Sequence, residues 1–220
     1  MTEKKKVEKG DFVEIEFTGK TKEGRVFDTT DAETAKKNDF FNPNAAYGPK
    51  GVCVGERHLL RGIDEQLVGK GLEKNYEIEL KPEEAFGKKS AKMLRLVPIG
   101  VFRKQKIDPV PGLQIIMDNG LGTIRTVSGG RIIVDFNHPL AGKDIVYEIK
   151  INKILTEPEE KVLSLTRVYL NTDAKIEIKE EKALIQLKQK FPKEIIDGLS
   201  RDIKRLIPKI TEVEITEEKV

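Results

Sequence analysis

This sequence has few of the residues on which most enzyme sites depend. It contains no tryptophan, a single cysteine (Cys53) and two histidines (His58 and His138). One cysteine cannot form a disulfide within the chain, and these three residues lack the spacing of metal ligands. A glycine-rich phosphate loop, a nucleophile elbow and a dinucleotide-binding fingerprint are also missing. We therefore expect no metal and no cofactor, and we interpret Cys53, which lies between valines, as a buried apolar residue.

Long apolar runs and a large excess of one charge are missing as well. No stretch approaches the roughly 18 apolar residues of a membrane helix, and no apolar run follows the lysines near the start of the chain, so neither a membrane span nor a secretory signal is expected. The 40 Lys and Arg residues against 37 Asp and Glu give a net charge of only +3. This balance disfavours a protein that is basic throughout and binds nucleic acid. The combination favours a location in the cytoplasm.

The first part of the chain alternates between apolar and polar residues in short runs. Residues 11–17 and 76–80 have the period of strands with one buried face, and a second strand is expected at 25–30. Residues 59–69 have the spacing of a short helix that ends at a glycine. Between these elements, residues 31–51 are rich in Asn, Pro and Gly, which predicts a long irregular loop.

Five short motifs in this part of the chain resemble those of FKBP-type peptidyl-prolyl isomerases. In order, they are Phe17-Thr18-Gly19, Gly24-x-Val26-Phe27-Asp28-Thr29-Thr30, Val54-Gly55-Glu56, Leu59-Leu60-x-Gly62-Ile63 and Ala85-Phe86-Gly87. Each motif is weak by itself, and it is their order within 87 residues that makes the resemblance specific. The resemblance implies an α+β fold in which an antiparallel sheet wraps around a short helix.

A single-domain member of this family would end with one more strand soon after residue 87. Here the chain instead continues with strand patterns at 93–97, 112–117, 122–127 and 131–135, one of whose turns is Asp118-Asn119-Gly120. These patterns predict a small all-β unit. The string Asn137-His138-Pro139-Leu140-Ala141-Gly142 then resembles the SlyD-type branch, in which a flap domain with chaperone activity is inserted before the final strand. That strand is expected within residues 144–151.

Residues 155–220 match no motif of known function. Helical spacing after Pro158 and at 195–207, a hairpin at 175–187 and a strand at 213–215 predict an α+β module. Long archaeal-type FKBPs are similar in carrying such a domain, which suggests a homodimer formed through it; the alternative is an extension packed on the core or the flap. The predicted domains are thus an isomerase domain at 1–87 and 134–154, a flap at 88–133 and a C-terminal domain at 155–220.

The resemblance implies an apolar pocket as the catalytic site. Rotation about an X–Pro bond crosses a barrier of roughly 18–20 kcal/mol because the planar amide is conjugated, and a dry apolar site disfavours the planar form relative to the twisted one. Ordinary core packing is the alternative for the apolar members, and a turn or cap role is the alternative for Asp28. The residues that match the family's pocket are Phe17, Phe27, Asp28, Leu59, Leu60 (through its N–H), Ile63, Phe86 and Tyr147, with Tyr47 at the rim.

Two departures from the family pattern favour a second hypothesis. Many relatives have Tyr where this chain has Phe86 and Trp where it has Ile63, so the alternative function is a holdase chaperone whose isomerase activity is weak or vestigial. Unfolded or partly folded proline-containing polypeptides are the expected partners in both cases. The apolar flap residues predicted to bind such clients are Ile99, Val101, Phe102 and Met117, with packing inside the flap as the alternative.

The charge of the predicted flap suggests a third hypothesis, contact with nucleic acid or the ribosome. Residues 88–133 contain nine Lys and Arg residues but only Asp108 and Asp118 as acidic residues. Phe102 is the only aromatic residue in this stretch, so a platform for base stacking is lacking and nucleic acid is an unlikely partner. A basic flap instead favours clients with acidic segments.

Overall fold

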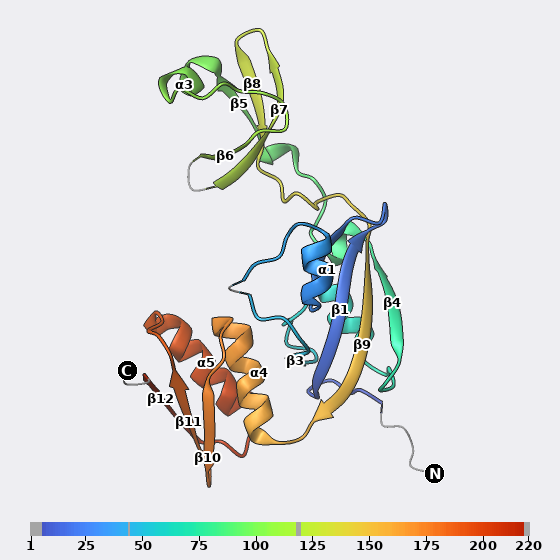
Figure 1. The fold of residues 1–220 in the computed structure, drawn as a ribbon, viewed down its shortest axis with the longest axis vertical. Coiled ribbons are helices and arrows are strands. Elements are labelled where there is room, and N and C mark those ends of the chain that lie inside the picture. Colours follow the sequence, from blue (N-terminus) through green and yellow to red (C-terminus); the bar gives the residue numbers. More distant parts are fainter. Residues whose placement is uncertain (1–5, 44, 118–119, 218–220) are drawn as a thin grey trace. The chain divides into compact units, whose positions relative to one another are not determined.

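The structure, a computed structural model, describes residues 6–43, 45–117 and 120–217. The chain forms two compact units, one from residues 1–80 and 144–220 and the other from residues 81–143 (Figure 1). The second unit is inserted between two neighbouring strands of the first. Two residues of the predicted turn Asp118-Asn119-Gly120 lie outside the described residues. No helix in the described ranges is long and apolar enough to cross a membrane.

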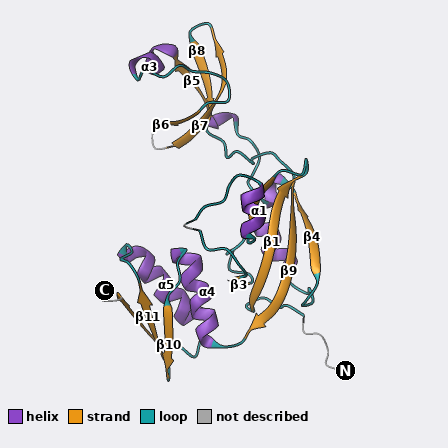
Figure 2. Ribbon diagram, viewed as in Figure 1, coloured by secondary structure: helices purple, strands orange, loops and turns teal. Residues whose placement is uncertain are grey.

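The first unit is built on a five-stranded antiparallel sheet with the order β2-β1-β9-β4, in which β3 also pairs with β1 (Figure 2). Its strands are β1 (Phe12–Thr21), β2 (Val26–Thr29), β3 (Lys50–Cys53), β4 (Asn75–Leu80) and β9 (Ile145–Leu155). The final strand of the predicted sheet is β9, which pairs with β1 from Phe12↔Leu155 to Thr21↔Ile145. An antiparallel sheet with few helices confirms the predicted α+β fold.

Alternation along β1 and β9 separates two faces of this sheet. Ile15 and Phe17 point into the core, whereas Glu14 and Glu16, which alternate with them, remain partly exposed. Helix α2 (Arg61–Leu67) covers the apolar face and buries Ile63 and Leu67. A second helix, α1 (Ala32–Lys37), lies in the stretch predicted to be an irregular loop. Since it has six residues and a single buried side chain, Ala35, it is too short to show a helical period.

Residues 155–217 form the predicted α+β module, and its core is continuous with that of the sheet. Helix α4 (Pro158–Leu170) lies beside β3 (Figure 1). Phe12 and Cys53 belong to the same buried cluster as Leu165 and Leu199. Burial raises the pKa of the Cys53 thiol to about 12, in keeping with a packing role. The elements are α4 (Pro158–Leu170), β10 (Lys175–Lys179), β11 (Lys182–Leu187), α5 (Lys193–Leu206) and β12 (Glu212–Glu217), with β11 between the other two strands.

The second unit contains a four-stranded antiparallel sheet of order β5-β8-β7-β6. The strands are β5 (Leu94–Pro98), β6 (Gln114–Met117), β7 (Gly120–Ser128) and β8 (Arg131–Asp135), close to the four predicted runs. The structure adds a short helix, α3 (Ile99–Lys104), that the sequence pattern did not reveal. This helix places Phe102 in the core beside Ile124 and Ile132, where the ring is only 1% exposed. The prediction that Phe102 is an exposed client-binding residue is therefore wrong.

Candidate active site

Three of the predicted pocket residues form one aromatic cluster on the core face of the first sheet. The ring centroid of Tyr147, on β9, lies 5.7 Å from that of Phe17 on β1 and 5.8 Å from that of Phe27 on β2. The planes of Phe27 and Tyr147 meet at 82°, an edge-to-face arrangement that aromatic pairs favour. Phe17 and Tyr147 are buried, whereas Phe27 is half-buried.

Gly19 makes room for this cluster. It faces Tyr147 in the register of β1 and β9, and a Cβ added to it would lie 2.7 Å from Cζ of Tyr147 and 3.1 Å from Cζ of Phe27. Any larger residue would therefore push one of the two rings away. Gly19 lies in the Phe17-Thr18-Gly19 motif, and a glycine inside a strand often marks a close approach of this kind.

Asp28 is joined to the aromatic cluster through the tyrosine hydroxyl. Tyr147 Oη donates a hydrogen bond to Asp28 Oδ2 over 3.0 Å. Burial raises the pKa of Tyr147, and the nearby negative charge of Asp28 raises this pKa further, so the hydroxyl remains a donor. The cap of α1 is Asp31, whose carboxylate accepts from the Thr34 N–H, and the alternative of a cap role for Asp28 therefore does not hold.

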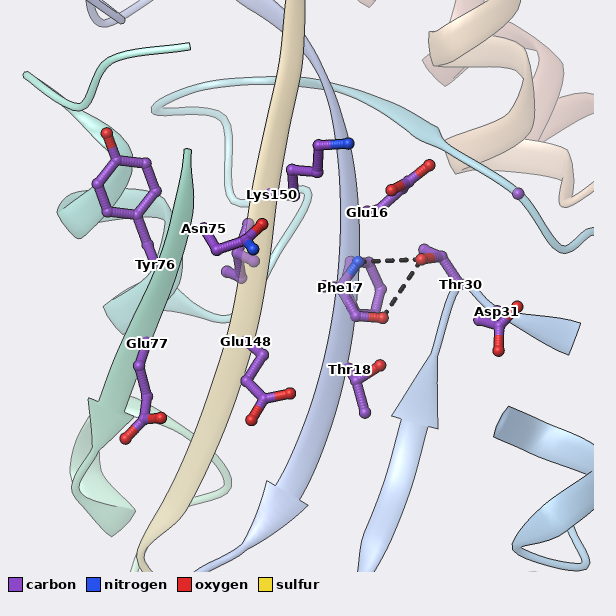
Figure 3. A pocket seen from close by; sticks show the side chains of 12 residues that line it. Glu16, Phe17, Thr18, Thr30, Asp31, Asn75, Tyr76, Glu77, Glu148 and Lys150 are labelled. Atoms are coloured by element: carbon purple, nitrogen blue, oxygen red, sulfur yellow. Dashed lines mark hydrogen bonds between the residues drawn. The ribbon is translucent and has the colours of Figure 1, made fainter. Parts of the chain in front are cut away.

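Hydrogen bonds with Thr29 and Thr30 fix the backbone position of Phe17. The Phe17 N–H donates to Thr30 Oγ1 over 2.9 Å, and the Thr30 hydroxyl donates to the Phe17 carbonyl over 3.3 Å (Figure 3). The Thr30 N–H donates to the same carbonyl over 2.9 Å. The hydroxyl of Thr29 also donates to that carbonyl, over 3.2 Å. The threonines after Asp28 thus have a positioning role that residue type alone did not reveal.

Leu59, Leu60 and Ile63 lie in the turn before α2 and in its first turn. The two leucines are half-buried, and Ile63 is 2% exposed. The N–H groups of Ile63 and Asp64 both donate to the Leu60 carbonyl, whereas the Leu60 N–H has no hydrogen-bond acceptor among the residues that the structure describes. An unused donor at this position is what the predicted contact with a substrate carbonyl requires.

Phe86 belongs to the second unit, and its ring stacks on His138 of the Asn-His-Pro-Leu-Ala-Gly string, with centroids 4.4 Å apart. Its role in the pocket stays a prediction. The predicted rim residue Tyr47 stacks on Phe41 with centroids 5.2 Å apart. No role is predicted for His138 from the sequence. Its position in the Asn-His-Pro-Leu-Ala-Gly string is the only feature of the sequence that could have indicated one.

A concavity of about 670 Å³ lies over β1, β4 and β9, and its lining includes Phe17 of the aromatic cluster (Figure 3). Its charged side chains are Glu16, Asp31, Glu77, Glu148 and Lys150. These charged groups suit neither a prolyl ring nor a twisted amide. In the described ranges, no group of His, Cys, Asp and Glu residues could hold a metal ion.

The second unit has an apolar surface of its own. By register, Leu94, Leu96, Ile116 and Leu121 share one face of its sheet, opposite the face that packs on α3. These side chains are exposed, Ile116 to 80%. The predicted client-binding residues lie elsewhere. Ile99 and Met117 pack against the core of the second unit, Phe102 lies inside that core, and Val101 is exposed.

Two parts of the chain match models of known protein families. Residues 3–98 match the family model described as FKBP-type peptidyl-prolyl cis-trans isomerase. Residues 95–140 match the model described as FKBP26, IF domain, and they coincide with most of the second unit. The two matches meet within β5, at the point where the inserted sheet begins.

Individual relatives agree with these matches. A short-type peptidyl-prolyl cis-trans isomerase of Methanocaldococcus jannaschii is 28% identical over 67% of this chain and 94% of its own length. The FKBP-type peptidyl-prolyl cis-trans isomerase SlyD of Pasteurella multocida is 32% identical over 47% of this chain and 53% of its own length. The SlyD of Haemophilus influenzae is 28% identical over 66% of this chain and 71% of its own length.

Proposed function

The chain belongs to the FKBP-type peptidyl-prolyl cis-trans isomerases, and we propose that the cluster of Phe17, Phe27 and Tyr147 is the pocket in which it isomerises X–Pro bonds. The observation behind this assignment is that three aromatic rings meet on one sheet face with a single carboxylate, Asp28, bound to one of them. Leu59, Leu60 and Ile63 complete the proposed lining within the first unit. The substrates are proline-containing polypeptides.

The proposed mechanism needs no nucleophile and no proton transfer. A prolyl ring packs against the aromatic side chains, which exclude water from the peptide bond. Because the planar amide is more polar across its C–N bond than the twisted one, the apolar surroundings favour the transition state over the ground state. The Leu60 N–H holds a substrate carbonyl, and Asp28 keeps the Tyr147 hydroxyl in one orientation.

A protease-coupled assay on a short prolyl peptide tests this assignment. The variant Phe27→Ala with Asp28→Ala is expected to lower kcat/KM at least about tenfold, since it removes one wall of the pocket and the partner of Tyr147. Phe191→Ala is the matched control, because Phe191 is a half-buried phenylalanine that packs on the core of the C-terminal module and not on the cluster. Wild-type kcat/KM in the folded double variant would exclude the cluster as the site.

The exposed apolar face of the second unit favours an additional function, the holding of unfolded polypeptides. Leu94, Leu96, Ile116 and Leu121 offer that face, and Ile116 is the most exposed of them. Unfolded clients expose apolar side chains, which gain by covering such a patch. The alternative that this chain is chiefly a holdase with a vestigial isomerase pocket is decided by measuring both activities on the same protein.

Suppression of client aggregation by the full-length chain tests the holding function. Ile116→Ser is expected to weaken client binding roughly tenfold, the loss that follows from one fully covered isoleucine, while kcat/KM on a short peptide stays unchanged. Val110→Ser is the control, because Val110 is 50% exposed in the same unit but lies outside the sheet. Equal suppression by both variants would show that the sheet face does not hold clients.

Two further parts of the proposal concern assembly and location. In this proposal the chain forms a homodimer through residues 155–220, as the resemblance to long archaeal-type FKBPs suggests, and it acts in the cytoplasm on newly made chains. Sedimentation equilibrium of the purified chain tests the first, and a monomer at all concentrations would contradict it. Fractionation of cells tests the second.

A further inference from the structure

The C-terminal module contacts the turn that leads into Leu59 and Leu60. Arg205, near the end of α5, donates through Nη2 to Glu56 Oε2 over 2.6 Å and to Asp202 Oδ1 over 3.0 Å. Glu56 precedes Leu59 by three residues. Arg205 therefore ties an element of the module to the segment that forms the proposed wall of the isomerase pocket.

This turn needs external support, because its backbone conformation is unfavourable by itself. Arg57 has a φ of 58°, in the left-handed region that residues other than glycine rarely adopt. The Asp64 carboxylate, 5% exposed, accepts from the Gly55 N–H over 2.9 Å and from the Arg57 N–H over 3.0 Å. On the other side, the Cys53 N–H donates to Nδ1 of His58 over 3.1 Å.

Arg205 is itself held in place before it reaches the turn. Its second partner, Asp202, lies three residues earlier on α5, and the Tyr169 hydroxyl of α4 donates to the same carboxylate. The hydrogen bond from Arg205 lowers the pKa of Glu56, so the pair is charged at neutral pH. A charged hydrogen bond whose donor is held in one orientation fixes the position of its partner better than an ion pair between two mobile surface side chains does.

We propose that Arg205 is a positioning residue for the isomerase pocket: by holding Glu56 it fixes the turn that presents Leu59 and the Leu60 N–H to the substrate. The C-terminal module thereby sets the affinity of the active site for its substrate, besides any role in assembly. This inference rests on the proposed function in one respect, the assignment of Leu59 and Leu60 to the pocket.

Steady-state kinetics on a short prolyl peptide with full-length protein test the inference. Arg205→Met is expected to raise KM about threefold to fivefold and to change kcat by less than about twofold, since the turn binds substrate but takes no part in the rotation. Glu56→Gln should raise KM in the same direction but less, because its amide oxygen still accepts from Arg205 without the charge. The double variant should be no worse than Arg205→Met alone, because the two residues share one interaction. Arg205→Lys should restore part of the affinity.

Arg167→Met is the matched control, because Arg167 pairs with Asp173 inside the same module and does not reach the turn. A second readout is the amide resonance of Leu60 in a two-dimensional ¹H–¹⁵N spectrum, which should move in Arg205→Met and not in Arg167→Met. A Leu60 resonance and a KM that are the same in both variants would overturn the proposal.

The two readouts also separate this inference from the proposed function. If the Leu60 resonance moves but KM does not, Leu60 is not part of the pocket and the proposed positioning of the substrate is overturned, whereas the aromatic cluster is judged by its own double variant. If Arg205→Met is too unstable to assay, Glu56→Gln, on the other partner, supports or overturns the inference by the same two measurements.

Discussion

The inserted unit and the C-terminal module are joined to the isomerase sheet in opposite ways. The insertion encloses a core of its own around Phe102 and Ile124, and its two connecting segments are held to each other by polar groups: Asn137 accepts from the Ser90 N–H and donates to the Ser90 carbonyl. The module instead continues from β9 into α4 and shares one buried cluster with Phe12 and Cys53. An added segment whose buried cluster continues into the sheet becomes part of the same unit, whereas one that encloses its own buried cluster forms a separate unit. The length of the segment does not decide this.

This difference suggests a division of labour. A unit with a separate core can change its conformation or bind a client without altering the isomerase sheet, which suits a chaperone flap. A module that shares a core transmits any change in packing to the sheet, which suits the positioning role inferred for Arg205. The predictions that follow test this contrast, from the largest expected effect to the smallest.

Loss of one side chain in the shared core should destabilise module and sheet together. Leu165→Ala removes a fully buried residue of α4 and is expected to lower the free energy of unfolding by about 3 kcal/mol. Amide hydrogen exchange should then accelerate in β3 and β9 as well as in the module. Unchanged protection of β3 and β9 would mean that the module unfolds by itself and that the contrast is wrong.

The corresponding substitution in the core of the inserted unit should destabilise only that unit. Ile124→Ala removes a fully buried residue of β7, and a cost of about 3 kcal/mol is again expected. Exchange should accelerate only in β5–β8, and kcat/KM on a short peptide should be unchanged. Loss of protection in β9 would show that the two units are coupled more tightly than their cores suggest.

The module and the sheet approach each other closely at Gly51 of β3. A Cβ added there would overlap Oγ of Ser164 on α4, so Gly51→Ala forces the helix and the strand apart. The expected cost is about 2 kcal/mol, measured as a lower midpoint of thermal unfolding. Gly51→Ala combined with Ser164→Gly should recover most of it, and failure to recover would point to the strand itself rather than the contact.

The polar connection of the flap should contribute less. Asn137→Ala removes the pair of hydrogen bonds with Ser90 and is expected to cost about 1 kcal/mol, confined to the connecting segments. Faster exchange of the Ser90 amide, with β1 and β9 unaffected, is the expected result. Loss of protection in β9 would contradict an independent flap.

The smallest effect concerns the pH dependence of the turn beside Arg205. Burial lowers the pKa of His58, although the carboxylates of Glu56, Asp64 and Asp202 oppose this and Arg205 supports it. His58 therefore takes up a proton in the unfolded chain before it does in the folded one, and stability falls as the pH drops below the unfolded value of about 6.5. Protonation would also remove the acceptor of the Cys53 N–H.

Chemical denaturation at pH 7 and pH 6 measures this contribution, which is at most about 0.7 kcal/mol over that range. His58→Gln keeps an acceptor but has no proton to gain, so it should remove the difference. A variant with the same pH dependence as the wild type would show that another group titrates.

Much of the fold could be predicted from local patterns. The predicted strands at 11–17, 76–80 and 131–135 and the predicted helix after Pro158 fall on β1, β4, β8 and α4, because alternation and helical spacing persist over several residues. Helices α1 and α3 were missed, since six residues do not complete two turns. For the same reason Phe102 was misplaced: without α3, nothing in the sequence directs its ring inwards.

The candidate site was predicted in part. Motif positions selected Phe17, Phe27 and Tyr147, and the structure brings their rings together. The sequence did not indicate the residues that position these rings. They are Gly19, which lies opposite the tyrosine ring, and Thr30, which forms a hydrogen bond with the Phe17 backbone. These roles depend on which strands become neighbours, and residue type does not specify that.

The sequence by itself determined the periodic elements, the family motifs and the basic character of the insertion, because each is a property of neighbouring residues. Only the tertiary structure decided that Tyr147 binds Asp28, that Arg205 reaches Glu56, and that the C-terminal module shares a core with the sheet while the flap does not. Each of these contacts joins residues far apart in the chain. Their energies depend on where the backbone returns and which side chains it excludes from water.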